Sequence, residues 1–422
     1  MKKPKIAVIG AGVSGLSVAH LLEDRFDLTV LERDDAPGGL IRCKSIDGCL
    51  FHLCGGHVFN TKHEDVLEWV KHFVVFDKDY IKADRNASIV LENGCQVPYP
   101  IENHIYYLDK GLQQQCIQDF LQIASSGEQS YLNFEDFLKK RFGKTLYDWY
   151  FSSYNWKVWR SSLDQIPLSW LEGKLPMPTI EEILFNNINH FEEKSFVHSS
   201  FWYPRHNGSQ FFADRLAEGL DIRYNTSVEE VSYDAMTSRW SVAGDEYDGI
   251  VFCGNIKELP SILKGVDLDA YYNDIESLRY HGTTSVFCEI DKNPYSWIYL
   301  PSREYDSHRI ICTGNFSPYN NAEGRMTATV EFTDQIDEEQ ILDNLDRMPY
   351  HPRYLTHQYN QYTYPIQSRD TAAMIRSLKN YLSNKRFYMT GRFADWEYYN
   401  MDVAIKAAMD VCETIKNTGT IT

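Results

Sequence analysis

The first residues of the chain alternate between strand-like and helix-like runs of apolar side chains. Residues 5–9 and 28–31 are short apolar runs, and residues 16–23 between them have the composition of a helix. Short continuous apolar runs bounded by turn residues are typical of strands buried on both faces. The order strand, helix, strand therefore predicts two parallel strands joined by a crossover, the opening unit of a Rossmann-like domain.

Later parts of the chain carry other patterns. Residues 113–123, 134–142 and 146–159 are predicted to be helices. Residues 225–231 are expected to begin a strand, which residues 239–242 and 249–253 continue as a hairpin and a further strand. Apolar and polar positions alternate in residues 284–290, 297–300, 308–312 and 326–332, which predicts an antiparallel sheet. A last strand at 387–390 precedes a helix at 403–415.

The turn after the first strand carries a glycine pattern with a physical purpose. Gly10, Gly12 and Gly15 form G-x-G-x-x-G between strand and helix, and Glu32 ends the second strand. Gly10 makes the tight turn, Gly12 admits a pyrophosphate, and Gly15 lets helix and strand pack closely. The helix start offers free N–H groups to phosphates. Glu32 is expected to bind the ribose hydroxyls, which disfavours NADP and predicts a dinucleotide site.

The residues after Glu32 favour FAD over NAD. Arg33 follows directly, and Gly38-Gly39 come a few residues later. This E-R-x-x-x-x-G-G run resembles the extended FAD fingerprint of the amine-oxidase and related flavoprotein superfamily. The predicted fold class is thus α/β: a Rossmann-like FAD-binding domain with a helical insert and an antiparallel-sheet substrate domain. The expected parts are FAD domain 1–80, connecting sheet 81–110, helical insert 111–190, FAD domain 191–270, substrate sheet 271–345 and FAD domain 346–422.

A second motif narrows the resemblance. The run H-L-C-G-G-H-V-F-N-T at residues 52–61 resembles the H-x-x-G-P-H-x-F-H-T segment of UDP-galactopyranose mutases, with Gly56 for Pro and Asn60 for His. The resemblance implies that His57 lies beside the flavin. Gly55 and Gly56 would allow the backbone to approach the flavin ring. Residues 99–104, Y-P-I-E-N-H, look like a further turn of the same family.

Similarity to these mutases continues to the end of the chain. Tyr154 and Trp159 keep the spacing of family residues that line the uridine pocket, although ordinary helix packing explains such a pair as well. Arg309, Tyr364 and Tyr398 fall in segments that resemble those which contact the substrate diphosphate. Arginine suits this task because its planar fork donates two parallel hydrogen bonds.

The same resemblance implies the contacts of the flavin at the end of the chain. Residues 391–402, G-R-F-A-D-W-E-Y-Y-N-M-D, resemble the family stretch that ends the cofactor domain. Cofactor contacts are expected from Gly10, Gly12, Gly15, Glu32, Arg33, Gly38, Gly39, Gly55, Gly56, Val228, Gly391, Arg392 and Met401.

The resemblance also fails at a position that contacts the substrate in the mutases. Mutases carry a second arginine clamp on the diphosphate, and Pro178 stands at that place. Lys157, Lys174 and Arg205 are alternative cations, but an ammonium does not reproduce a bidentate guanidinium. The loss of one charge-assisted contact costs about 1.5–3 kcal/mol, which weakens the expectation of a UDP-sugar and opens the alternatives of another nucleotide sugar or a different reaction.

Composition limits the function further. The formal net charge is −17, which argues against a nucleic-acid partner. No apolar run is long enough for a transmembrane helix, and nine cysteines without a C-x-x-C pair suit a reducing cytoplasm. Aromatic residues make up 14% of the chain, and several lie inside the matched segments. A homodimer is compatible with the sequence.

The resemblance implies a flavin-dependent isomerase. In that family, reduced FAD attacks the sugar anomeric carbon, expels the nucleoside diphosphate and so exchanges pyranose for furanose, with His57, Arg309, Tyr364 and Tyr398 in the active site. Two other hypotheses stay open: an FAD oxidoreductase of the amine-oxidase type, and a non-catalytic FAD-binding relative suggested by Pro178.

Overall fold

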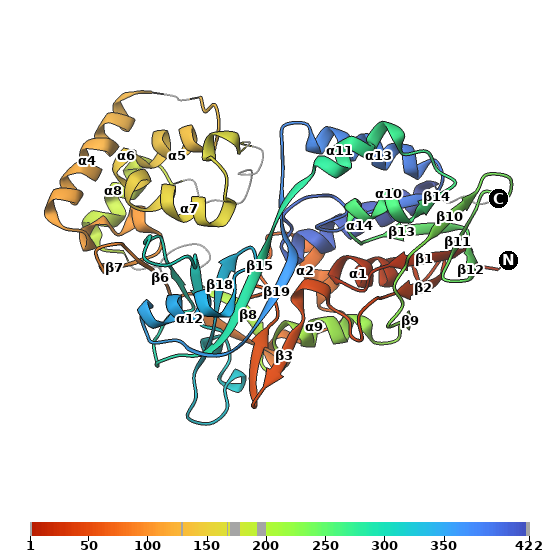
Figure 1. Cartoon of the computed structure of the whole chain (residues 1–422), viewed down its shortest axis with the longest axis horizontal. Coiled ribbons are helices and arrows are strands. Elements are labelled where there is room, and N and C mark those ends of the chain that lie inside the picture. The colour runs from red at the N-terminus through yellow and green to blue at the C-terminus, as the bar shows by residue number, and fades with distance from the viewer. Residues whose placement is uncertain (1, 128–129, 167, 169–177, 192–199, 419–422) are drawn as a thin grey trace.

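The computed structural model describes residues 2–127, 130–166, 168, 178–191 and 200–418. Figure 1 shows three regions: a parallel sheet with its helices beside both termini, a large antiparallel sheet next to it, and a separate helical lobe. The helical lobe contains α4–α8, and the antiparallel sheet lies between it and the parallel sheet.

The parallel sheet has the strand order β20-β13-β1-β2-β9. Its strands are β1 (Lys5–Ile9), β2 (Asp27–Leu31), β9 (Ile222–Arg223), β13 (Gly249–Phe252) and β20 (Phe387–Met389). One face is covered by α1 (Val13–Leu22), α9 (Gly208–Ala217) and α14 (Met401–Thr418). Because successive side chains point to opposite faces, Val8 packs toward α1 and α14 while Ala7 and Ile9 pack on the other side. The predicted Rossmann-like unit is confirmed.

The other face of this sheet is covered by a second layer. It contains the sheet β12-β11-β10-β14, with β10 (Val231–Asp234), β11 (Arg239–Val242), β12 (Asp245–Tyr247) and β14 (Leu263–Lys264). Helices α10 (Leu259–Ile262), α11 (Asp269–Ser277) and α13 (Thr371–Ser383) complete it. The strand expected over residues 225–231 is wrong: that segment is irregular, and the strand begins at Val231. Asn225 with φ 54° turns the chain there, which an extended strand does not permit.

The antiparallel sheet has the order β19-β15-β18-β17-β16-β6-β7. Its strands are β6 (Ala87–Val90), β7 (Gln96–Pro98), β15 (Arg279–Glu289), β16 (Trp297–Tyr299), β17 (Arg309–Ile311), β18 (Thr327–Thr333) and β19 (Arg353–Ile366). The pair β6–β16 is parallel, and the other pairs are antiparallel. Strands β6, β7 and β19 lie outside the residues 271–345 expected for this sheet, because pairing between distant segments leaves no local signal.

The two faces of the antiparallel sheet differ in character. One face is apolar and packs against α12 (Glu338–Arg347) through Ile341 and Leu345. On the opposite face one register row carries Tyr299, Arg309 and Glu331 side by side on β16, β17 and β18. Side chains of paired residues point to the same face of a sheet, so this row forms a polar surface. The candidate site is built on it.

The helical lobe matches the predicted insert. It contains α4 (Lys110–Ser125), α5 (Phe134–Phe142), α6 (Lys144–Leu146), a π-helical segment (Tyr147–Phe151), α7 (Ser152–Trp159) and α8 (Ile180–Asn189). Asp109 and Asn133 cap the starts of α4 and α5, and Thr179 forms a capping box with Glu182 at α8. Caps of this kind satisfy N–H groups that have no partner inside the helix.

Two small ribbons and two short helices join the regions. They are β3 (Cys43–Ile46) with β4 (Cys49–His52), β5 (Tyr80–Asp84) with β8 (Ser200–Pro204), α2 (Glu64–Val70) and α3 (Phe76–Asp79). Single helical turns lie at Gly39–Ile41, Ile101–Asn103, Ile105–Tyr107, Leu163–Gln165, Ile256–Glu258, Thr313–Asn315 and Pro318–Asn320. The ribbon β3–β4 leads the chain from the parallel sheet to the polar face of the antiparallel sheet.

Candidate active site

The glycine loop after β1 forms the nucleotide end of the site. The Gly10 N–H donates to the Leu31 carbonyl at 2.8 Å, which ties the loop to β2. A Cβ on Gly15 would lie 1.9 Å from the Gly10 carbonyl oxygen, whereas a Cβ on Gly12 would meet no atom within 4 Å. Gly15 is thus required by packing within the protein. Gly12 leaves open space at the start of α1, where phosphates are favoured.

Glu32 and the second glycine pair complete this loop. The Glu32 carboxylate is buried and accepts from the Ala11 N–H at 2.6 Å and the Asp34 N–H at 2.9 Å. The Gly38 N–H donates to the Ala11 carbonyl at 2.8 Å, and Gly38 with φ 120° lies beside Gly12. The two glycine segments thus form one cradle. Its residues fit a dinucleotide.

The remaining cofactor residues of this region lie at its edge. Gly39 has φ 54° and a Cβ there would lie 3.4 Å from Gly12 Cα, so it belongs to the cradle. Arg33 is exposed and lies 3.4 Å from the Glu258 carboxylate. Val228 is half-buried against the core beneath β10, outside any strand. Arg33 and Val228 stay predictions as cofactor contacts.

The loop after β4 carries Gly55, Gly56 and His57 against the antiparallel sheet. The Gly55 N–H donates to the Glu331 carboxylate at 3.0 Å. A Cβ on Gly56 would lie 2.6 Å from Ile311 Cγ2, so the packing of this loop against β17 requires glycine at this position. The His57 Nε2 atom is buried and has no hydrogen-bond partner within the described residues.

The environment of His57 keeps its ring neutral. Burial, together with the nearby Arg392 guanidinium, lowers the pKa of His57 to about 4. Desolvation disfavours the charged imidazolium, and a neighbouring positive charge adds to the effect. An orphaned buried nitrogen is costly unless a ligand satisfies it. His57 is therefore suited to contact a bound cofactor or substrate.

Four side chains form a continuous stack beside this loop. Arg309 donates through its terminal nitrogen to the Tyr364 hydroxyl at 3.1 Å. The rings of Tyr364 and Tyr398 are parallel within 11° with centroids 5.4 Å apart, and the Arg392 guanidinium lies 4.3 Å from the Tyr398 ring centroid. The order Arg309, Tyr364, Tyr398, Arg392 links the antiparallel sheet to the cofactor domain. All three predicted diphosphate ligands are brought together here.

Glu331 orients Arg309, the residue at one end of this stack. It is 1% exposed and accepts from the Arg309 Nε as well as from Gly55. Burial alone would raise its pKa, but the Arg309 charge and the nearby His308 ring, whose Nε2 lies 3.6 Å from the carboxylate, hold the pKa of Glu331 at about 2. The ionised carboxylate fixes the guanidinium plane. Sequence analysis missed Glu331; a lone acid inside the buried run T-A-T-V-E-F-T was the available signal.

The segment 391–401 brings the end of the chain to the glycine loop. Gly391 has φ 115°, and a Cβ there would lie 3.2 Å from Ser14 Oγ on α1. Arg392 donates to the carbonyls of Tyr399 at 2.5 Å and Thr363 at 3.2 Å, so it holds this segment on β19. Met401 begins α14, which packs along α1. Two helix starts therefore lie in the cofactor region.

Tyr154 and Trp159 have different surroundings. The Tyr154 ring lies edge-on to Tyr299 at 5.4 Å and stacks on Tyr150 at 5.5 Å. Tyr299 is the neighbour of Arg309 across the strand pair, so Tyr154 borders the polar row. Trp159 is 3% exposed and lies in the core of the helical lobe. Both stay predictions as substrate-binding residues, and the position of Trp159 favours packing.

The proposed replacements for the second clamp have other partners. The Lys157 ammonium is buried and donates to three backbone carbonyls, so it is not available as a clamp. Arg205 donates to the Lys78 carbonyl at 2.9 Å. The Pro178 carbonyl accepts from Arg141 at 2.6 Å, and Lys174 lies outside the described residues.

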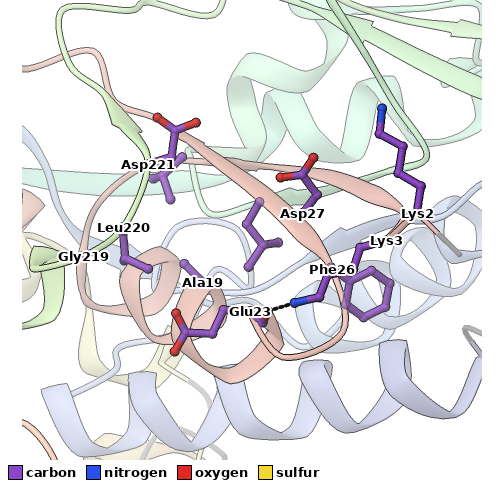
Figure 2. A pocket seen from close by; sticks show the side chains of 11 residues that line it. Lys2, Lys3, Ala19, Glu23, Phe26, Asp27, Gly219, Leu220 and Asp221 are labelled. Atoms are coloured by element: carbon purple, nitrogen blue, oxygen red, sulfur yellow. Dashed lines mark hydrogen bonds between the residues drawn. The ribbon is translucent and has the colours of Figure 1, made fainter.

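A separate pocket lies at the opposite edge of the parallel sheet (Figure 2). It is lined by Lys2 and Lys3 before β1, by the end of α1, by β2 and by the turn Gly219–Asp221, and Lys3 donates there to the Glu23 carbonyl at 2.7 Å. Ligands of open α/β sheets bind at the carboxyl ends of the strands. The pocket of Figure 2 is thus not the dinucleotide site.

The described ranges contain no cluster of His, Cys, Asp and Glu side chains that would hold a metal ion. Within the same ranges, the helices are all too short or too polar to cross a bilayer.

Fold and site together define a dinucleotide-binding protein in which a second sheet brings an arginine–tyrosine stack to the cofactor. The model of the flavin containing amine oxidoreductase family matches residues 13–416, and the chain belongs to that family. It is 23% identical to dTDP-fucopyranose mutase of Escherichia coli, over 98% of this chain and 99% of the relative. It is 24% identical to a probable UDP-galactopyranose mutase of Klebsiella pneumoniae, over 98% and 95%.

The fold comparison agrees. The structure of a reduced UDP-galactopyranose mutase superimposes with a TM-score of 0.87 at 21% identity, covering 100% of this chain and 95% of the other. The predicted resemblance to these mutases and the predicted α/β fold class are confirmed. The chain is a mutase-like flavoprotein.

Proposed function

We propose that the chain is an FAD-dependent nucleotide-sugar mutase that interconverts pyranose and furanose forms. The observation that carries this proposal is the stack Arg309–Tyr364–Tyr398–Arg392, which joins the polar face of the antiparallel sheet to the cofactor segment. The full-length similarity to two sugar-nucleotide mutases supports it. Gly10, Gly12, Gly15, Glu32, Gly38, Gly39 and Gly391 would hold the FAD.

Arg309 would bind the diphosphate of the substrate. Its Nε is engaged by Glu331 and one terminal nitrogen by Tyr364, so its orientation is set before substrate arrives. A preorganised cation stabilises charge that develops on a leaving group more than it stabilises the ground state. The guanidinium is thus suited to stabilise the departing nucleoside diphosphate.

Tyr364 and His57 would act as neutral groups. Burial raises the pKa of Tyr364 well above its usual value, so its hydroxyl stays a hydrogen-bond donor. His57 is neutral because its pKa is lowered to about 4. Bound in its reduced form, FAD would supply the electron pair that displaces the nucleotide from the anomeric carbon. The chain's own groups orient the diphosphate and the flavin-facing loop.

One anaerobic experiment tests the proposal. Dithionite-reduced protein is incubated with UDP-galactofuranose or dTDP-fucofuranose, and the products are separated by chromatography. Conversion to the pyranose form with reduced but not with oxidised protein is expected. Absence of conversion with both substrates, together with peroxide formation from amines, would instead identify an oxidoreductase.

A variant connects this activity to the site. Arg309→Lys keeps a positive charge but loses the fork and the Glu331 contact, so KM is expected to rise about ten- to a hundred-fold. Arg376→Lys, at an exposed position of α13 on the cofactor domain, serves as a matched control and should leave KM unchanged.

A further inference from the structure

Lys157 forms an unusual buried contact between the helical lobe and the antiparallel sheet. It lies on α7 and is 5% exposed. Its ammonium donates to the carbonyls of Leu300 at 2.6 Å, Ser302 at 2.5 Å and Ser307 at 2.9 Å. An ammonium has three N–H donors, and all three find an acceptor. The charge is thus solvated by backbone carbonyls from one turn of the chain.

That turn connects two strands of the polar row. It follows Tyr299, the last residue of β16, and precedes Arg309, the first residue of β17. Leu300 N–H donates to the His308 carbonyl at 2.9 Å, which closes the turn across its ends. Because Lys157 binds carbonyls near the beginning and the end of the turn, it holds both strand ends together.

The helix side of the contact also belongs to the site. Tyr154 lies one helical turn before Lys157, and its ring packs edge-on against Tyr299 at 5.4 Å. Residues three apart on a helix lie on neighbouring positions of one face. The same face of α7 therefore carries the Tyr154 ring, which lies beside the polar row, and the Lys157 ammonium, which binds the turn before Arg309.

A second polar contact holds the end of α7. Both nitrogens of His281, on β15, face acceptors: the Trp159 carbonyl at 2.7 Å and the Asp334 carboxylate at 2.9 Å. The end of α7 is fixed at this point even without the ammonium. Loss of the Lys157 contact is thus expected to loosen α7 and the turn locally, and not to release the helical lobe.

We propose that Lys157 is a positioning residue that sets the distance between Tyr154 and Arg309, and through it the fit of the nucleotide diphosphate. The inference rests on the proposed function, since it assigns the same site to a nucleotide ligand. Lys157 touches no reacting atom. It acts through the 300–308 turn on Arg309 and through α7 on Tyr154.

The test uses the flavin-loaded protein and its Lys157→Met variant, with UDP and dTDP as probes. Methionine keeps the length of the side chain and removes the charge and the donors. Nucleotide affinity, measured by calorimetry, is expected to fall at least tenfold. Amide exchange is expected to rise in residues 152–159 and 300–309 alone, with flavin content unchanged. Lys144→Met, an exposed lysine of the same lobe, is the control and should change neither quantity.

Unchanged affinity with unchanged exchange would overturn the proposal, and so would a rise of exchange throughout the chain, which indicates a merely structural lysine. If the methionine variant does not fold, nucleotide affinity and amide exchange are measured on Lys157→Gln instead, with the same expected results. Binding and exchange are read without turnover. Failure of the mutase assay with wild-type protein would therefore refute the proposed function, while a nucleotide affinity independent of Lys157 would refute this inference.

Discussion

The Arg309 Nε donates to the Glu331 carboxylate across the strand pair β17–β18, on the polar face of the antiparallel sheet. The same carboxylate accepts the Gly55 N–H at 3.0 Å. One buried acid thus joins Arg309 to the loop that carries His57. Glu331 accepts from two sides and donates to none, a requirement that an amide does not meet.

Glu331→Gln tests this relationship. The amide NH₂ would face either Gly55 N–H or the Arg309 donor, and the guanidinium would lose its charged partner. Breaking a buried ion pair costs about 3–5 kcal/mol of the free energy of unfolding. We expect a loss near the lower end, about 3 kcal/mol, by denaturant unfolding, together with weaker nucleotide binding.

Glu289→Gln is the matched control for that change. Glu289 lies on neighbouring strand β15 and pairs with Arg325 nearer the surface. Partly exposed pairs contribute about 0–1 kcal/mol, so this variant should keep its stability within that range. Equal losses in both variants would contradict a special role for Glu331.

Two glycines of the nucleotide loop are predicted to respond differently to alanine. Gly12 has φ −74° and free space around its Cβ position, so Gly12→Ala should leave the melting temperature of the apoprotein unchanged. The methyl group would occupy the space of the pyrophosphate, and the purified variant should contain little flavin by its absorbance.

Gly15→Ala is expected to damage the fold itself. Its Cβ would lie 1.9 Å from the Gly10 carbonyl oxygen, a distance that forces α1 away from β1. The apoprotein should melt at a lower temperature by circular dichroism. For the Gly12→Ala variant of the preceding paragraph, a normal flavin content would contradict the prediction, since it would show that the cofactor does not lie against Gly12.

His52 makes the stability of the protein depend on pH. Burial, and the nearby His57, lower its pKa from 6.5 to about 3 in the folded protein. The unfolded chain therefore binds a proton as the pH falls below 6.5, and the folded chain does so only near pH 3. His52 therefore contributes to the free energy of unfolding above pH 6.5, and this contribution declines by about 1.6 kcal/mol between pH 6.5 and pH 5.

His52→Gln should reduce this acid dependence of the unfolding free energy by the share that His52 contributes, while the buried His57 keeps its own share. Glutamine still reaches Tyr203 or Ser209, the two hydrogen-bond partners of His52, but does not titrate. His63→Gln, at an exposed position, is the control and should keep the wild-type slope. A wild-type slope in the His52 variant would refute the assignment.

Tyr154 and Trp159 are predicted to separate binding from folding. Tyr154→Ala removes a ring beside the polar row, and loss of base stacking costs about 1–3 kcal/mol, so nucleotide affinity should fall about tenfold or more. Trp159→Ala leaves a cavity in the core of the helical lobe, which costs about 3–5 kcal/mol of stability. Denaturant unfolding and nucleotide titration of both variants distinguish the effects; an intact fold with lost binding in Trp159→Ala would restore Trp159 to the site.

Local patterns predicted much of the cofactor domain. Its glycine turns and buried strands, like the capped helices of the lobe, depend on residues close in sequence, so β1, α1, β2 and the helices of the lobe could be predicted from the local pattern. The irregular segment before Val231 is different: the N–H groups of Asn225 and Thr226 donate to the carbonyls of Asp34 and Glu32, in the loop after β2. The polar–apolar pattern of residues 225–230 does not indicate these hydrogen-bond partners, because the partners are distant in sequence.

The amino-acid sequence by itself determined the Rossmann-like unit and the flavin fingerprint, because each rests on residue type and short spacing. The resemblance of three segments to the mutases singled out Arg309, Tyr364 and Tyr398, and their diphosphate contacts stay a prediction. Only the tertiary structure showed that Glu331 orients Arg309, that Gly56 leaves room for the Ile311 side chain and that Lys157 donates hydrogen bonds to the turn before β17. The physical reason is that these roles depend on burial and on acceptors supplied by distant backbone. Those are properties of the packed chain, and no local pattern contains them.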